Sequence, residues 1–145
     1  MLVSVEELSK TSLYPEIIDK IVRGSRESAE LQILAAEGWV KSYMSKYDLI
    51  AIFGTETEPP AFQSELIKKV VKIIASYYLV RLANPNVDIE LYRADYEDVL
   101  KWLEDLQAGK LNPDLPYAPD DGEDGNGAAN GDVWFESNPK RINFF

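Results

Sequence analysis

Three long stretches of apolar residues at helical spacing constrain the fold more than any other feature of the sequence. In residues 26–47, 61–82 and 89–108, apolar side chains recur every three or four positions, the period of one buried helix face. The first stripe comprises Ala29, Ile33, Ala36, Val40, Tyr43 and Tyr47. The second comprises Phe62, Leu66, Val70, Ile73, Tyr77 and Val80, and the third Tyr92, Tyr96, Val99, Leu103 and Leu106. These stripes predict an all-α bundle whose central helix is 61–82, because its apolar face is the widest.

Two shorter helices are expected before the long ones. Ser4 followed by Glu7 is a capping-box pattern, so a short helix should begin there. Pro15 suits the first turn of a second short helix, which Gly24 ends. The prediction is therefore a compact bundle of about five helices, two short and three long, that forms a body over residues 1–109.

The chain changes character after this body. Residues 110–119 carry three prolines, and residues 120–132 read DDGEDGNGAANGD, with five acids, no base and no large apolar side chain. Such a segment cannot offset its ordering entropy by burial, so residues 110–132 are predicted to be a proline-rich, acidic, flexible linker. Residues 133–145 are again apolar and aromatic, and are predicted to be a short extended arm with at most a short strand near 133–136.

An aromatic arm on a polar tether is typical of a segment that binds another protein. It can add a strand to a sheet edge or place aromatic anchors in pockets. The expected partner-binding residues are Trp134, Phe135, Lys140, Arg141, Ile142, Phe144 and Phe145. Folding of the arm back onto its own body is the alternative that remains open.

Composition limits the chemistry that the chain can perform. It has no cysteine and no histidine, which excludes disulfides and thiolate nucleophiles and removes the usual general base and the commonest transition-metal ligand. Its net charge of −10 disfavours a protein that grips phosphate backbones. No apolar run is long enough for a transmembrane helix, and no signal peptide is expected. Composition therefore makes catalysis the less favoured function without excluding it, and we expect a protein of the cytoplasm without membrane contact or sequence-specific nucleic-acid binding.

Acidic residues suggest two metal-binding alternatives. The run from Asp120 fits a calcium-binding loop poorly, because Gly131 stands where a bidentate Glu is needed, and a solvated linker is the better interpretation. The pairs Glu27/Glu30 and Asp95/Asp98 each place carboxylates one helical turn apart, as in helical magnesium-dependent nucleotide pyrophosphohydrolases. One-turn acidic pairs are also frequent on solvated faces. A helical regulatory module that binds one protein partner is the other alternative.

Several short patterns occur in a characteristic order along the chain: Lys46-Tyr47-Asp48, Tyr77-Tyr78, Arg93-x-x-Tyr96, Trp102-Leu103, Gly109 and Ser137-Asn138-Pro139-Lys140. In this order and spacing they resemble the head–tail joining proteins (connectors or adaptors) of Mu-like phages and prophages. The chain departs from that pattern at Lys46, where Arg is expected, and at Glu136, where a small residue is frequent.

This resemblance implies a helical adaptor that assembles as a ring between the phage portal and the tail-completion protein, around a channel for the genome. It implies a structural protein with no enzymatic activity and no cofactor. The protein would be made in the host cytoplasm and would end in the neck of the virion. A subunit isolated from the template on which the ring forms is expected to be compatible with a monomeric state.

Overall fold

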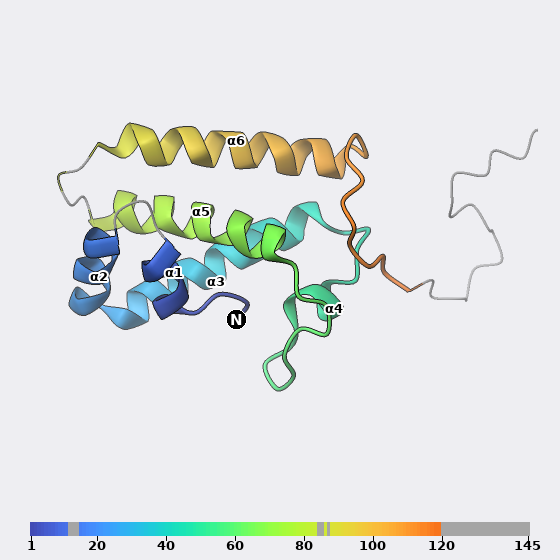
Figure 1. Cartoon of the computed structure of the whole chain (residues 1–145), viewed down its shortest axis with the longest axis horizontal. Helices are drawn as coiled ribbons and strands as arrows, with labels where there is room; N and C mark the ends of the chain where they lie inside the picture. The colour runs from blue at the N-terminus through green and yellow to red at the C-terminus, as the bar shows by residue number, and fades with distance from the viewer. Residues whose placement is uncertain (12–14, 84–85, 87, 120–145) are drawn as a thin grey trace, which may run out of the picture.

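The computed structural model describes residues 1–11, 15–83, 86 and 88–119, and this part of the chain forms six α-helices (Figure 1). They are α1 (Val5–Thr11), α2 (Pro15–Gly24), α3 (Arg26–Tyr43), α4 (Leu49–Phe53), α5 (Glu65–Ala83) and α6 (Ile89–Gln107). Within these ranges the β-structure is limited to one isolated antiparallel bridge between Tyr47 and Tyr117. The predicted all-α fold is confirmed.

The long helix α5 is the centre of the bundle, as its wide apolar face predicts. It packs against α3 on one side and α6 on another, while α1 and α2 cover α3 and α5 near one end of the body (Figure 1). Nine of its 19 residues are buried, more than in any other helix. Fully buried Ile67, Ile74 and Leu79 lie in the same core cluster as Ile33 of α3 and Leu103 of α6.

Polar side chains begin the helices where the sequence predicts them. The Ser4 hydroxyl accepts a hydrogen bond from the Glu7 amide at 3.1 Å, which is half of the predicted capping box. Ser25 caps α3 and Asp88 caps α6 in the same way. These caps fix the first turns of both long helices.

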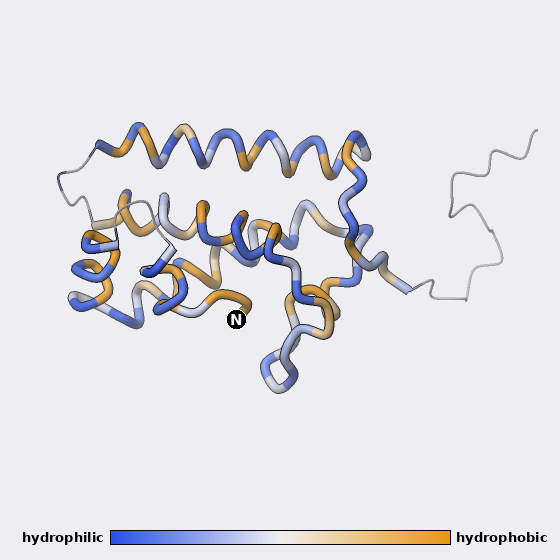
Figure 2. Tube along the Cα trace, viewed as in Figure 1, coloured by the Kyte–Doolittle hydropathy of each residue, from blue (hydrophilic) through white to orange (hydrophobic). Residues whose placement is uncertain are grey.

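The helix α4 is a feature that the sequence analysis does not predict, because five residues are too few to show a periodic pattern. Asp48 caps it by accepting a hydrogen bond from the Ala51 amide at 2.9 Å. Gly54 ends it with a φ of +73°, where a Cβ atom would lie only 2.6 Å from the Glu58 carbonyl oxygen. Figure 2 shows α4 as an almost wholly hydrophobic helix, and its Ile52 and Phe53 are buried.

Two of the predicted helix boundaries differ from the structure. The first long helix ends at Tyr43 rather than near residue 47, and the second begins at Glu65 rather than near residue 61. Phe62 precedes α5, and its amide donates to the Ala51 carbonyl at 2.9 Å. Leu66, which the second predicted stripe includes, is 45% exposed, whereas its neighbour Ile67 is fully buried.

None of the helices in the described part of the chain combines the length and the apolarity that a membrane crossing requires.

Candidate interaction surfaces

The arm that the sequence analysis selects for partner binding lies outside the described residues. This applies to the predicted strand near 133–136, to residues 120–132 of the predicted linker, and to all the expected anchors: Trp134, Phe135, Lys140, Arg141, Ile142, Phe144 and Phe145. Their role stays a prediction. The surfaces of the body are therefore the evidence that bears on function.

The chain that leads to the arm is attached to the body at the end of α3. The amide of Asp48 donates to the Pro116 carbonyl at 2.9 Å, and the amide of Ala118 donates to the Lys46 carbonyl at 3.1 Å. The ring of Tyr117 stacks on the buried ring of Tyr47, with centroids 5.1 Å apart. This contact gives the pattern Lys46-Tyr47-Asp48 a structural role, since it holds residues 116–118 in place.

Both the linker and the body contribute buried residues to this attachment. Leu115 is 6% exposed and joins the main core cluster. Burial, followed by the proximity of Tyr117, raises the pKa of the Tyr47 hydroxyl. The predicted boundary at residue 109 stays a prediction, but residues 115–118 of the predicted linker contact the body, so the part of the chain packed on the body extends at least to residue 118.

Tyrosines from three helices form a cluster beside this core. Tyr77 of α5 and Tyr96 of α6 stack with centroids 4.5 Å apart, and Tyr78 lies 6.1 Å from Tyr96. Burial, with Tyr96 and Tyr43 close by, raises the pKa of Tyr78 to about 12. Tyr77, Tyr78 and Tyr96 belong to the quoted family patterns, and the structure brings them together as packing between α5 and α6.

The cluster extends to the surface at both ends. Contact with the Tyr77 hydroxyl, followed by the charge of Glu90, raises the pKa of exposed Arg93. On the other side Trp39 packs edge-on against Tyr43, with centroids 5.8 Å apart. Trp39 is itself 41% exposed. The tyrosine cluster thus connects the α5–α6 interface to the outward side of α3.

The outward side of α3 is apolar although it faces solvent. Leu31 is 57% exposed and Leu34 49%, and together with Ala35, Gly38 and Trp39 they recur at helical spacing on the side opposite the core. Between residues 31 and 40 the sole charged side chain is Glu37, which is buried and accepts a hydrogen bond from the Leu2 amide. We call Leu31, Leu34, Ala35, Gly38 and Trp39 the α3 outer face.

The sequence analysis missed this face, although the sequence contained the signal. It identified the stripe that begins at Ala29, and the structure confirms the burial of Ile33, Ala36 and Val40 in that stripe. A second apolar stripe at 31, 34, 35, 38 and 39 follows the same period on the other side of the helix. A surface helix with two apolar sides has a second side available for a partner.

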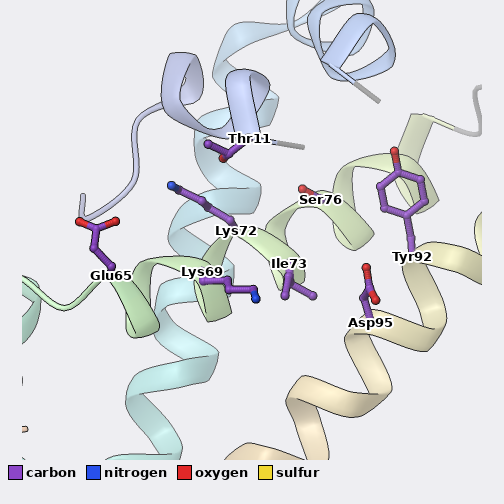
Figure 3. Close-up of a pocket in the computed structure, with 8 residues that line it drawn as sticks. All are labelled: Thr11, Glu65, Lys69, Lys72, Ile73, Ser76, Tyr92 and Asp95. Atoms are coloured by element: carbon purple, nitrogen blue, oxygen red, sulfur yellow. The ribbon is translucent and has the colours of Figure 1, made fainter. Parts of the chain in front are cut away.

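A groove of about 480 Å³ lies between α1, α5 and α6 (Figure 3). Figure 3 shows Lys72 and Thr11 on one side of it and Tyr92 and Asp95 on the other, with Ile73 between them. Lys72 pairs with Glu7 of α1 at 2.9 Å, and this contact, with the nearby charge of Lys68, lowers the pKa of Glu7.

Two of the three lysines in the first half of α5, Lys68, Lys69 and Lys72, are mostly shielded from solvent. The side chains of Lys68 and Lys72 are only 16% and 14% exposed, and both lie within 4.0 Å of Glu7. Lys68 also pairs with Glu65 of its own helix at 3.4 Å. Only Lys69 among the three remains exposed. The lysines therefore attach α1 to α5, which is a structural use of the groove.

The acidic pairs do not assemble into a metal site in the described part of the chain. Within it, no three acidic side chains gather closely enough to hold a metal ion. Glu30 instead pairs with Arg26 of its own helix at 3.1 Å. The magnesium-dependent alternative gains no support from this region.

One comparison with known proteins finds a match. The family model described as "Bacteriophage Mu, Gp36" matches residues 15–130, about four fifths of the chain. The searches of curated proteins and of solved structures find no match. The matched range includes every helix from α2 to α6 and the attachment at residues 115–118.

Proposed function

The chain belongs to the bacteriophage Mu Gp36 family and is thus a phage protein, and on this premise we propose that it is a structural subunit of the phage neck. In this proposal it is a head–tail connector, or adaptor, that assembles in a ring between the portal and the tail-completion protein. It has no catalytic activity and no cofactor. Its place is the host cytoplasm during assembly and the neck of the finished virion.

The α3 outer face is the observation that carries this proposal. More than a quarter of the residues of this chain are charged, yet this solvent-facing side presents two leucines, a tryptophan and two small residues without a charge. A contiguous exposed apolar side costs solubility unless another protein covers it. A ring subunit needs such a side for contact with its neighbour.

The attachment of residues 116–118 to the end of α3 also fits a connector. It fixes the point from which the arm leaves the body, so that every subunit in a ring would present its arm from an equivalent position. The aromatic anchors predicted in the arm could then bind the portal or a neighbouring subunit at an equivalent site. Such repeated contacts raise the effective concentration of each weak one.

Deletion of the gene from a phage or prophage that carries it tests the proposal. After induction, the proposal predicts DNA-filled heads and separate tails by negative-stain microscopy, and restoration of tailed particles when the wild-type gene is supplied. Immunogold label against the protein should mark the head–tail junction. Tailed, infective particles in normal numbers from the deletion would contradict the proposal and favour a regulatory module.

A further inference from the structure

Two adjacent depressions lie where the end of α5 meets α2 and the start of α3. One, of about 540 Å³, is lined by Ile21, Leu82 and Ala83 together with Lys20 and the small residues Gly24, Ser25 and Ser28. The other, of about 390 Å³, is lined by Gln32, Tyr78, Arg81 and Leu82. They share Leu82, which is 60% exposed. We treat both depressions as one surface, the α2/α5 groove.

The α2/α5 groove has an apolar lining and two cationic side chains. Lys20 and Arg81 are both exposed, and within the described part of the chain neither makes an ion pair. An apolar surface with one cation in each depression suits an extended segment that carries apolar anchors and negative charges. A nucleic acid is a poor fit, because the chain has a net charge of −10 and, among the described residues, the two depressions hold only these two cations.

One segment of the same chain has this composition. Residues 132–136 read Asp-Val-Trp-Phe-Glu, which places two aromatic side chains between two acids. The second half of the arm has the opposite charge, because Lys140 and Arg141 precede its phenylalanines. Like charges would keep that half away from Lys20 and Arg81, so charge complementarity selects residues 132–136.

The groove and the start of the arm lie at opposite ends of the body. Residues 116–118 are held beside Lys46 and Asp48, beyond the C-terminal end of α3, whereas the groove lies at the N-terminal end of that helix. The 18 residues of α3 separate the two ends by about 27 Å. Figure 1 shows the last described residues leading away from the body at the end opposite α2.

We propose that residues 132–136 of one subunit dock in the α2/α5 groove of the next subunit, with an aromatic side chain of this segment as the apolar anchor and the flanking acids near Lys20 and Arg81. An arm that leaves one end and binds at the other makes a head-to-tail contact, which closes into a ring when the rotation between subunits permits. That the arm comes from a neighbouring subunit, rather than from the same chain, rests on the proposed function.

A labelled peptide tests the docking directly. A fluorescein-labelled peptide of residues 130–138 is titrated with the full chain carrying W134A and F135A, so that its own anchors do not compete. We expect saturable binding by fluorescence anisotropy. K20E together with R81E should weaken it about tenfold, and a peptide with D132K and E136K should restore binding to that variant. K69E, which changes another exposed lysine of α5 away from the groove, is the matched control and should have no effect.

The contradicting results are equally specific. Absence of saturable binding, or equal binding by the K20E/R81E chain, would overturn the docking. The 15 residues from Pro119 to Val133 span up to about 50 Å, so an arm could also reach its own groove. In that case the chain's own arm would compete with the peptide, and the wild-type chain would bind the peptide at least tenfold more weakly than the W134A/F135A chain. This result would overturn the proposal that the arm comes from a neighbouring subunit.

The peptide assay separates this inference from the proposed function. It uses no phage component, so a failure to bind the peptide leaves the neck assignment in place. Conversely, normal tailed particles from the gene deletion would contradict the neck assignment while a charge-reversal rescue of peptide binding would still establish the groove.

Discussion

The two outer long helices, α3 and α6, present opposite kinds of surface to solvent. The outward side of α6 is dominated by charge, with exposed Glu90, Arg93, Asp95, Glu97, Asp98, Lys101 and Glu104 around a single exposed leucine, Leu91. The α3 outer face has no charge, although its Leu34 is as exposed as Leu91, at 49% against 45%. Both helices pack on α5 through similar apolar stripes, so the fold does not require this difference. In the proposed function, the charged side of α6 stays in solvent and the α3 outer face is the side that a partner covers.

The largest expected effect is a difference in stability between alanine substitutions on the buried side and on the exposed side of α3. Ile33 is fully buried and its neighbour Leu34 is half exposed. We expect Ile33→Ala to lower the free energy of unfolding by about 2–5 kcal/mol, because it removes buried methyl groups and leaves a cavity. Leu34→Ala should change it by less than about 0.5 kcal/mol. Urea unfolding of the two variants makes the comparison, and equal losses would contradict a solvent-facing Leu34.

Loss of the cap on α4 should have a smaller effect, at the attachment of the arm. Asp48 accepts a hydrogen bond from the Ala51 amide through its side chain and donates its own amide to Pro116. Asp48→Ala removes the first bond and keeps the second, so we expect a loss of about 1 kcal/mol in unfolding free energy. Asp98→Ala, on the exposed side of α6, is the control and should leave stability nearly unchanged.

Alkaline pH should weaken the tyrosine cluster that connects α3 to α6. The pKa of Tyr78 is about 12 in the folded protein against an ordinary value of 10.0. Its stabilising contribution is therefore complete below pH 10 and is lost as the pH rises from 10 towards 12. At pH 11, between the two values, a substantial part of this contribution is lost.

Unfolding free energies measured at pH 9 and pH 11 test this titration. Tyr78→Phe should reduce the loss between the two pH values, because phenylalanine has no proton to release. An unchanged loss in that variant would assign the alkaline sensitivity to other groups.

The regular parts of the fold could be predicted because helical periodicity is local. The stripes of α3 and α6 are buried largely as predicted, and Ser25 and Asp88 begin their helices. The helix α4 and the late start of α5 were missed because they depend on tertiary contacts, such as the bond from Phe62 to Ala51. A helix of five residues has no period to detect.

The candidate surfaces were harder to predict for a different reason. Which residues of a proline-rich segment contact the body is a long-range property, so the stacking of Tyr117 on Tyr47 could not be read from the sequence. The α3 outer face was visible as a second stripe, but its exposure depends on where α1, α2 and α5 pack. The pairing of Lys72 with Glu7 likewise joins helices that are far apart in the chain.

The most direct test of the account replaces one leucine on each outer helix. Leu34→Glu and Leu91→Glu introduce the same charge at positions of nearly equal exposure, and both purified variants should fold with near wild-type stability. In a gene-deleted phage, the account predicts that Leu91→Glu restores tailed particles, whereas Leu34→Glu lowers their number at least tenfold. Equal restoration by the two variants would contradict the central claim that the α3 outer face is covered by a partner in the assembled neck.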